Sequence, residues 1–443
     1  MKCSSSSDAI SVFNAMDEPN SVTYNALIGG FAENQEVIYG FQVFKDMQQR
    51  GFVPDSFTFA GVLETCTSTS GVEDVNRGLQ LHCQTIKFGL CSTAFIGNVL
   101  LTMYSKFNLI EEAEQVFRLI EEKDVISWNT IISSCSNCGD HDKSLILFST
   151  MTEVGARPDN FTFASVLAAC AGLALDRHGR QLHAHIIRTR FCQDVGVKNA
   201  LMNMYAKCGS ITSAVHVFNH MVQRNLVSWN TIIVGFANHG FAWRALEYFQ
   251  QMQELGIIPD AITFIGILTA CNHAGLVDEG LAYFDSMEQM YRILPNVEHL
   301  SCLIDMLGRA GRLKEAEEYL RKFPFGSDPV VLGSLLSACR LHGDVVIGQR
   351  LAGMLLSLHL STTSPYVLLS NLYASDEMWN SVADARKMLK VSGLKKEPGY
   401  SLIEVEGRVE KFTIGDFSHS RVGDIKDILR RLNLEIMETT LPN

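Results

Sequence analysis

Apolar residues recur along the chain at spacings of three and four, which is the period of an amphipathic helix. One such helix is predicted where Trp229, Ile232, Ile233 and Phe236 share a face, and a glycine stop follows it. A second helix begins near Ala242 and carries its own apolar face. The local pattern therefore predicts two antiparallel helices joined by a short turn.

This helix pair recurs at a long, fixed period. Asn25, Asn129 and Asn230 each follow an aromatic residue, and they lie 104 and 101 residues apart. Pro-Asp pairs at 54–55, 158–159 and 259–260 keep the same two spacings. Two unrelated markers with one period indicate a repeat array.

Each long period divides into shorter repeats of about 31, 35 and 35 to 38 residues. One helical hairpin cannot bury its apolar face alone, so stacked neighbours must supply the core, which predicts an all-α solenoid with a concave inner face. The nine predicted repeats are 21–55, 56–93, 94–124, 125–159, 160–194, 195–225, 226–260, 261–296 and 297–328, preceded by a partial short repeat over 1–20.

Composition narrows the class of protein. Hydrophobic residues make up 47% of the chain, but no apolar stretch approaches the roughly 20 residues of a membrane span, so no membrane partner is expected. Twelve cysteines lack metal-like pairing apart from Cys135 and Cys138, which favours free thiols, a reducing compartment and no cofactor. The net charge of −11 argues against a protein that coats a polyanion.

The repeats resemble the plant pentatricopeptide repeat (PPR) family in lengths, starts and ends together. Residues 22–28 (VTYNALI) and 51–55 (GFVPD) are similar to the start and end of a family repeat. Residues 198–209 (KNALMNMYAKCG) resemble a short family repeat. The alternation of lengths over residues 1–328 resembles the mixed-length (PLS) subclass, which implies a superhelix like that of PPR and tetratricopeptide repeat proteins.

In that family, one repeat reads one RNA base through its fifth and last residues. A carboxamide offers both a donor and an acceptor to a pyrimidine, so its partner decides the preference. The resemblance implies uracil for Asn25 with Asp55, Asn98 with Asp124, Asn129 with Asp159 and Asn230 with Asp260, cytosine for Asn199 with Asn225, and guanine for Ser301 with Asp328. Ala60 with Thr93 and Ala164 with Asp194 depart from the code. With protein and RNA parallel, the expected RNA is U-x-U-U-x-C-U-x-G.

Structural alternatives compete with this interpretation. The asparagines could be helix caps or turn-stabilising residues. Residues at the second repeat position could sandwich bases or simply form core: Val22, Phe57, Phe95, Ile126, Phe161, Val227 and Ile262, with Gly196 and Glu298 breaking the series. Lys106, Lys207 and Arg309 share the thirteenth position of the short repeats and could contact phosphates or form a solvated stripe.

The C-terminal region changes pattern. Residues 329–396 predict two further helix pairs and resemble the family's degenerate E-type repeats, and 397–443 resemble its E+ extension. Residues 398–405 (PGYSLIEV) are similar to the family's P-G-Y-S-W-I-E-V box, and 415–420 (GDFSHS) to its G-D-x-S-H-P stretch. Alternation about Glu406 and Gly407 predicts a β-hairpin, and a polar helix is expected over about 422–437.

No catalytic grouping is found. A zinc deaminase needs H-x-E and P-C-x-x-C, but no histidine has glutamate two residues later, and the one C-x-x-C, Cys135–Cys138, lacks the proline. The chain is therefore expected to be a non-enzymatic site-recognition factor for organellar C-to-U RNA editing, which binds single-stranded RNA and recruits a DYW-type deaminase or other editing factor in trans through residues 329–443. Alternatives are a protein-binding helical scaffold, favoured by the acidic charge, and an RNA splicing or stability factor.

The N-terminal sequence bears on where in the cell the protein is expected. Residues 2–20 align without gaps with residues 207–225, so the chain begins in mid-repeat. No Arg-rich presequence is found, and we expect the natural protein to extend upstream and carry an organellar address. Family resemblance implies the mitochondrion, with the chloroplast as the alternative.

Overall fold

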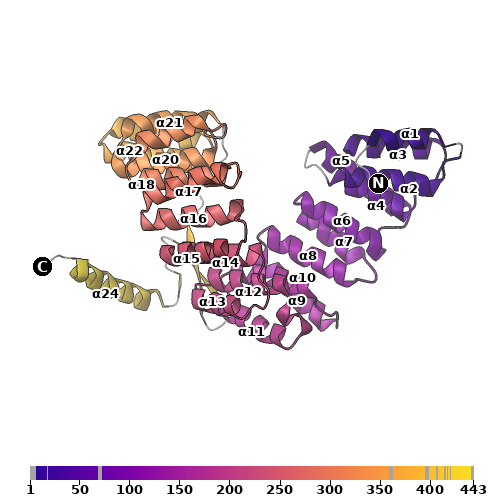
Figure 1. The fold of residues 1–443 in the computed structure, drawn as a ribbon, viewed down its shortest axis with the longest axis horizontal. Helices are drawn as coiled ribbons and strands as arrows, with labels where there is room; N and C mark the ends of the chain where they lie inside the picture. The colour runs from indigo at the N-terminus through magenta and orange to yellow at the C-terminus, as the bar shows by residue number, and fades with distance from the viewer. Residues whose placement is uncertain are drawn as a thin grey trace. The chain divides into compact units, whose positions relative to one another are not determined.

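Successive antiparallel helix pairs make up most of the chain (Figure 1). The computed structural model describes residues 6–16, 18–67, 72–358, 363–394, 399–405, 408–413, 416, 418–419 and 421–440. Over these residues the structure is helical except for connecting turns and one two-stranded sheet. The predicted all-α solenoid with a small C-terminal hairpin is confirmed.

The chain divides into two units, residues 1–225 and residues 226–443. The described helices of the first unit are α1 (Ser6–Asn14), α2 (Ser21–Glu33), α3 (Val37–Gln49), α4 (Ser56–Cys66), α5 (Val72–Lys87), α6 (Ala94–Lys106), α7 (Ile110–Leu119), α8 (Val125–Asn137), α9 (His141–Glu153), α10 (Asn160–Gly172), α11 (Asp176–Ile187), the 3-10 helix η1 (Arg190–Gln193), α12 (Val195–Lys207) and α13 (Ile211–Asn219).

The second unit continues the helical pairs and ends in the sheet and a last helix. Its described elements are α14 (Leu226–Asn238), α15 (Ala242–Glu254), α16 (Ala261–Ala274), α17 (Val277–Gln289), α18 (Val297–Arg309), α19 (Leu313–Lys322), α20 (Pro329–His342), α21 (Val345–Ser357), α22 (Ser364–Ser375), α23 (Trp379–Val391), β1 (Tyr400–Val405), β2 (Arg408–Thr413) and α24 (Val422–Thr440).

The first helices of consecutive pairs stack on one another within each unit. In the first unit α2 packs on α4, α4 on α6, α6 on α8, α8 on α10 and α10 on α12. In the second unit α14, α16, α18, α20 and α22 follow one another in the same way. Second helices such as α3, α9 and α15 pack beside their own first helix. Each unit therefore has a continuous layer of first helices.

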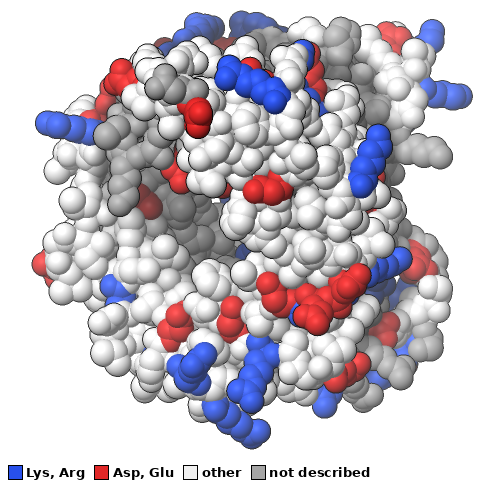
Figure 2. Space-filling view, turned by 90° about the vertical axis from the view of Figure 1, so that its right-hand side faces the viewer, with Lys and Arg blue, Asp and Glu red and all other residues white. Residues whose placement is uncertain are grey.

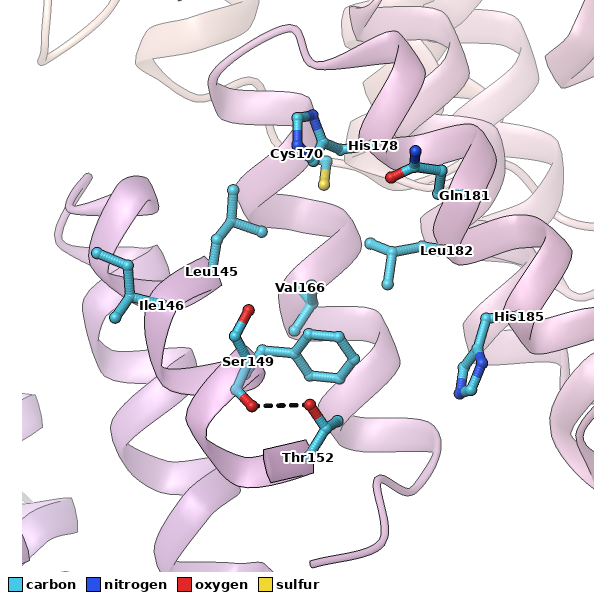
Figure 3. A pocket seen from close by; sticks show the side chains of 11 residues that line it. Leu145, Ile146, Ser149, Thr152, Val166, Cys170, His178, Gln181, Leu182 and His185 are labelled. Atoms are coloured by element: carbon cyan, nitrogen blue, oxygen red, sulfur yellow. Dashed lines mark hydrogen bonds between the residues drawn. The ribbon is translucent and has the colours of Figure 1, made fainter. Parts of the chain in front are cut away.

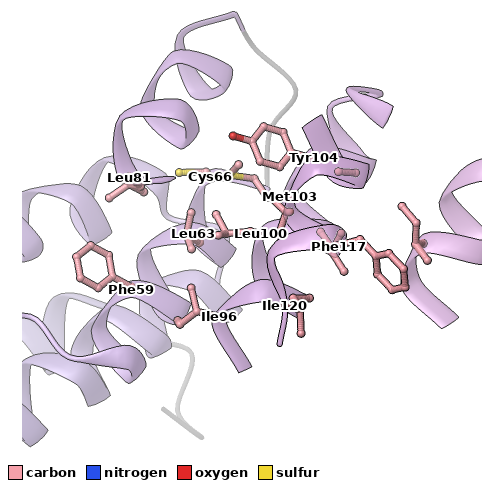
Figure 4. Close-up of a cluster of buried hydrophobic side chains, with 14 of the residues drawn as sticks. Phe59, Leu63, Cys66, Leu81, Ile96, Leu100, Met103, Tyr104, Phe117 and Ile120 are labelled. Carbon is pink, nitrogen blue, oxygen red and sulfur yellow. The ribbon is translucent and has the colours of Figure 1, made fainter. Parts of the chain in front are cut away.

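The core lies between the helices of each pair and their neighbours. In the first unit α4, α5, α6 and α7 contribute to one cluster of buried side chains, drawn in Figure 4. Its labelled members are Phe59, Leu63, Cys66, Leu81, Ile96, Leu100, Met103, Tyr104, Phe117 and Ile120. In the second unit, the apolar face predicted on α14 is buried, with Trp229 2% and Ile232 1% exposed. Burial of these stripes is what stacks one pair on the next.

The strands β1 and β2 pair antiparallel, with Tyr400 opposite Thr413 and Val405 opposite Arg408. The predicted hairpin is therefore present, although its turn residues, Glu406 and Gly407, lie outside the described residues. So do Pro398, Gly415, Phe417 and Ser420 of the two C-terminal motifs, and residues 2–5 and Asp17 of the N-terminal alignment. The last helix, α24, ends at Thr440 rather than near 437. Among the described helices, none has the length and apolar character that crossing a membrane requires.

Candidate nucleic-acid interface

The end of a repeat is held by the start of the next helix. Gly51, just beyond α3, has φ 81°, the left-handed conformation that glycine adopts readily. After Pro54, Asp55 is the N-cap of α4, and its Oδ1 accepts the Thr58 N–H at 2.8 Å. Thr58 Oγ1 in turn accepts the Asp55 N–H at 3.1 Å, which completes a capping box. Helix capping therefore fixes the position of the last carboxylate.

The fifth residue of the same repeat, Asn25, reaches this carboxylate from α2. Its Nδ2 donates to Asp55 Oδ1 at 3.0 Å and lies 3.2 Å from Oδ2. Asn25 is inside the helix, whose cap is Asn20, so the interpretation of Asn25 as a helix cap is wrong. The helix cap at this junction is the aspartate, and the asparagine is its hydrogen-bond donor.

The same contact recurs along the first helices of both units. In each case the asparagine Nδ2 donates to an oxygen of the last residue of its predicted repeat. The distances are 3.0 Å for Asn98 and Asp124, 2.9 Å for Asn129 and Asp159, 2.9 Å for Asn230 and Asp260, and 3.2 Å for Asn199 and Asn225. We call these four contacts, together with that of Asn25 and Asp55, the amide pairs. The structure thus brings together the two residues of each predicted asparagine pair.

A hydroxyl that the sequence interpretation overlooked completes four of the amide pairs. Thr58 Oγ1 lies 2.6 Å from Asn25 Oδ1 and 2.9 Å from Asp55 Oδ1. The other hydroxyl-to-asparagine distances are 2.6 Å for Ser127 with Asn98, 2.5 Å for Thr162 with Asn129 and 2.6 Å for Thr263 with Asn230. The sequence signal was available, because Ser or Thr stands three residues after each of these aspartates.

Hydrogen bonding stabilises the charged form of the carboxylates. Burial raises the pKa of Asp55, but donors from the Thr58 backbone, the Thr58 hydroxyl and the Asn25 amide outweigh it, so this pKa lies below its ordinary value. The pKa of Asp124 is lowered in the same way, against burial, by the Ser127 backbone, the Asn98 amide and the Ser127 hydroxyl. At neutral pH both groups only accept hydrogen bonds.

Ser301 and Asp328 are not joined in this way. Ser301 Oγ lies 3.3 Å from Ser334 Oγ, and Asp328 Oδ1 accepts the Val330 N–H at 2.8 Å as the N-cap of α20. Among the described side chains, these two share no hydrogen bond. Thr93 is the N-cap residue of α6, and the methyl group of Ala60, its predicted partner, has nothing to donate. Asp194 caps α12 by accepting the Val197 N–H at 2.9 Å, and its predicted partner is Ala164.

The apolar residues at the second repeat position are exposed, so their interpretation as core is wrong. They lie on the first helices, three residues before the asparagine position. Exposed fractions are 74% for Val22, 67% for Phe57, 47% for Phe95, 61% for Ile126 and 68% for Phe161 in the first unit, and 53% for Val227 and 54% for Ile262 in the second. The rings of Phe57 and Phe95 lie 5.5 Å apart between centroids. We call these seven residues the apolar row.

The basic residues of the short repeats end their first helices. Lys106, Lys207 and Arg309 are the last residues of α6, α12 and α18, and all three are exposed. Lys106 Nζ donates to Thr67 Oγ1 at 3.1 Å, and Arg309 pairs with Asp305 at 3.1 Å. On the face in Figure 2, basic and acidic side chains are interspersed and uncharged residues cover most of the surface. That face has no continuous basic area among its described residues.

A pocket of about 520 Å³ lies among α9, α10 and α11 and is mostly apolar (Figure 3). Leu145, Val166 and Leu182 line it, and His178 and His185 stand at its α11 side. In the described part of the chain, no three His, Cys, Asp or Glu side chains are grouped to hold a metal ion.

The C-x-x-C motif is also a poor zinc site. Burial raises the pKa of Cys135 to about 11, which disfavours the thiolate that zinc requires. The Sγ of Cys138 lies 2.8 Å from Asn108 Oδ1.

Comparison with known families decides the identity of the repeats. The PPR repeat family matches residues 19–68, 123–172 and 224–273. The PPR repeat matches 98–125, 197–226, 262–291 and 299–324, and the E motif matches 342–404. The chain belongs to the pentatricopeptide repeat family. Its repeats and E motif are consistent with a PLS-type PPR protein with an E extension.

Relatives of this PPR chain come from Arabidopsis thaliana. One is the mitochondrial pentatricopeptide repeat-containing protein At3g13770, 36% identical over 439 residues, covering 99% of this chain and 69% of the relative. Another is the chloroplastic protein At3g49170, 37% identical over 440 residues, covering 98% of this chain and 51% of the relative. The chain spans about half the length of several curated relatives that it matches.

A solved PPR structure shares the fold. The crystal structure of PPR10 from maize has a TM-score of 0.61 and 19% identity, covering 88% of this chain and 62% of PPR10. A second PPR10 structure, in complex with an 18-nt psaJ RNA element, has a TM-score of 0.54 and 18% identity, covering 89% of this chain and 68% of that chain. At this level of identity the likeness shows the PPR solenoid fold alone.

Proposed function

We propose that this chain binds single-stranded RNA in a sequence-specific way, with one base placed at each amide pair. The observation that carries the proposal is the repeated geometry. Five asparagines, on the first helices α2, α6, α8, α12 and α14, donate to the last residue of their own repeats. An exposed apolar residue stands three positions before four of them, while Gly196 stands before Asn199.

Both kinds of group suit a base. Exposed apolar and aromatic side chains cover the faces of bases, and this contact tolerates any sequence. An amide held by a carboxylate presents a defined hydrogen-bonding edge, and this contact discriminates between bases. The Asn-Asp pairs at residues 25, 98, 129 and 230 would then select uracil, Asn199 with Asn225 cytosine, and Ser301 with Asp328 guanine. The target is U-x-U-U-x-C-U-x-G.

The comparisons support this proposal at the level of the family. PPR10, which has the same fold, was crystallised in complex with an RNA element. The relatives At3g13770 and At3g49170 carry mitochondrial and chloroplastic names, which support an organellar location. We place this protein in the mitochondrion, with the chloroplast as the alternative.

The E motif supports a finer role in C-to-U RNA editing. It matches residues 342–404, which follow the last predicted RNA-reading repeat. In this proposal the repeats choose the cytidine, and residues 329–443 recruit a DYW-type deaminase in trans. The chain's own part in this proposal is recognition rather than chemistry, since no histidine in its sequence has the glutamate two residues later that a zinc deaminase uses.

A second candidate function is a protein-binding scaffold. The net charge of −11 favours it, since an acidic surface gains little from the phosphate backbone that supplies most nonspecific nucleic-acid affinity. An RNA splicing or stability role is a third candidate, which shares the RNA-binding proposal and differs only at the C-terminal extension.

RNA binding by the purified full chain tests the proposal. Fluorescence anisotropy would compare UAUUACUAG RNA with a scrambled RNA of the same composition. We expect the designed RNA to bind at least about tenfold more tightly, which corresponds to about 1.4 kcal/mol. Equal affinity would reject sequence recognition, and no binding to either RNA would favour the scaffold. An editing assay with a separate deaminase would then test recruitment, with a chain ending at residue 328 as the comparison.

A further inference from the structure

The hydroxyl beside each asparagine of the four Asn-Asp pairs has a single proton and several neighbours. Thr58 Oγ1 accepts the Asp55 N–H, and it lies 2.6 Å from Asn25 Oδ1 and 2.9 Å from Asp55 Oδ1. Asp55 Oδ1 already accepts the Thr58 N–H and the Asn25 amide. The nearer acceptor, Asn25 Oδ1, is therefore the expected recipient of the hydroxyl proton.

These contacts hold both ends of the Asn25 amide. Its nitrogen donates one proton to Asp55, and its oxygen accepts from Thr58, which is fully buried. One amide N–H is left for another partner. Turning the amide over would place its oxygen against the Asp55 carboxylate, so the donation to Asp55 would be lost, and its NH2 group would face the hydroxyl, which could no longer donate to it.

The hydroxyl accompanies asparagine rather than helix capping. All five predicted repeats with asparagine at the fifth position are followed by Ser or Thr at the third residue of the next helix, namely Thr58, Ser127, Thr162, Ser228 and Thr263. The four complete repeats with another fifth residue are followed by Ile96, Val197, His299 and Val331. Asp194 caps its helix by accepting the Val197 N–H at 2.9 Å without any hydroxyl, so capping alone does not require one.

We propose that the Ser or Thr beside each of the four Asn-Asp pairs is a positioning residue for base selection, which locks the asparagine amide so that it presents a donor to the base. The proposal rests on the RNA-binding function above. A donor matches the carbonyl oxygens of uracil, whereas the 4-amino group of cytosine is itself a donor. Without the hydroxyl, the amide oxygen loses its partner and becomes available to the cytosine amino group. The hydroxyl therefore sharpens the choice of uracil over cytosine.

Two variants with matched RNAs test this role. Thr58→Val removes the hydroxyl beside the first base of UAUUACUAG, and Thr162→Val removes it beside the fourth. Each is measured against RNAs carrying uracil or cytosine at the first or the fourth base. We expect each variant to lower the uracil-to-cytosine affinity ratio about fivefold at its own base, the worth of roughly one net hydrogen bond, and to leave the other base unchanged.

Controls separate positioning from stability. Thr58→Ser keeps the hydroxyl and should restore the ratio. If the threonine served only to cap the helix, Thr58→Val would lower the affinity for both RNAs by the same factor. The uracil-to-cytosine affinity ratio would then stay constant, which would overturn the proposal. A change of ratio at the wrong base would overturn it as well.

A measurement without RNA keeps the test independent of the proposed function. The side-chain NH2 signals of Asn25, assigned by their loss in Asn25→Ala, report its hydrogen bonds in the free protein. In Thr58→Val we expect these protons to exchange faster with solvent, while those of Asn98 stay unchanged. Failure of the wild-type chain to bind RNA would reject the RNA function alone, whereas unchanged Asn25 signals would reject the lock.

Discussion

The Nδ1 atom of His82 lies 2.6 Å from the hydroxyl of Tyr104. The same contact, at 2.8 Å, joins His183 to Tyr205 one long period later. Burial lowers the pKa of His82, and it raises the pKa of Tyr104 to about 12, together with the charges of Glu112 and Cys83. In the described structure, His82 Nε2 has no hydrogen-bond partner. The ring is therefore accommodated in its neutral form.

Acid should weaken the fold at this histidine. Because the folded pKa lies below the unfolded value of about 6.5, the contribution is fully present above that value and is lost as the pH falls toward and through the folded pKa. We expect wild-type protein to lose more unfolding free energy between pH 7.5 and 5.0 than His82→Gln does. Urea unfolding at both pH values measures this, and equal losses would contradict it.

Replacement of the last carboxylate of a repeat by an amide should change the base preference at that pair and leave the stability of the fold nearly unchanged. Asp55→Asn keeps a good helix cap, so we expect unfolding free energy within about 0.5 kcal/mol of wild type. Its RNA preference at the first base should move from uracil toward cytosine. Asp55→Ala is the comparison, since loss of the cap should cost about 1 kcal/mol. Thermal melting and binding to the two RNAs measure these effects, and an unchanged preference would argue against a base at this pair.

Removal of a ring from the apolar row should weaken RNA binding selectively. Phe57 is 67% exposed, so Phe57→Ala should leave stability nearly unchanged but cost about 1 to 3 kcal/mol of RNA affinity through lost stacking. Trp243→Ala is a matched control, because Trp243 is 69% exposed on the second helix α15. Equal affinity losses in the two variants would show that the row has no special role.

Removal of an exposed lysine should reduce the dependence on salt. If Lys207 contacts a phosphate, Lys207→Gln should lower the slope of log affinity against log salt by about 0.7, the value for one contact on a single strand. Arg309→Gln should change it less, since Arg309 is paired with Asp305. A salt titration of RNA binding measures both slopes, and an unchanged slope for Lys207→Gln would favour the solvated stripe.

Truncation of a buried core residue to alanine should lower the unfolding free energy much more than truncation of an exposed residue on a neighbouring helix. Leu100 is completely buried on α6, and Leu100→Ala should lower unfolding free energy by about 2 to 5 kcal/mol. Ile126, 61% exposed on α8, should tolerate alanine within about 0.5 kcal/mol. Hydrogen exchange of the backbone amides in α6 and its neighbouring helices shows where the stability is lost. Protection that falls equally across both units would contradict the nearest-neighbour stability of a repeat array.

Sequence periodicity predicted the helices well because one physical requirement, burial of an apolar stripe, sets both the spacing of apolar residues in the sequence and the packing of the helices. Trp229 and Ile232 are buried as their spacing indicates. Spacing alone did not decide whether Phe57 packs or projects, because an apolar residue at one helix position fits either role until neighbouring helices are placed. The Thr58 hydroxyl was overlooked for a different reason. It belongs to the next repeat, and only stacking brings it to Asn25.

The sequence predicted which residues occupy the fifth and last positions of each repeat, but not which of these pairs form a hydrogen bond. Asn25 and Asp55 meet because a capped helix start lies beside the preceding first helix. Ser301 has a shorter side chain, and its hydroxyl on α18 lies beside Ser334 of α20 instead of Asp328. The pairing of a residue type with a repeat position therefore does not by itself give a hydrogen bond.

The last residue of a repeat also caps the next helix, so folding limits which residues this position can hold. In this chain that position holds only Asp, Asn or Thr, from Asn20 through Asp328. These belong to the few residue types that initiate helices well. Aliphatic and basic residues at this position would cost about 1 kcal/mol of stability for each cap that is lost. If this position selects a base as proposed, the set of bases open to the array is limited by the chemistry of starting a helix.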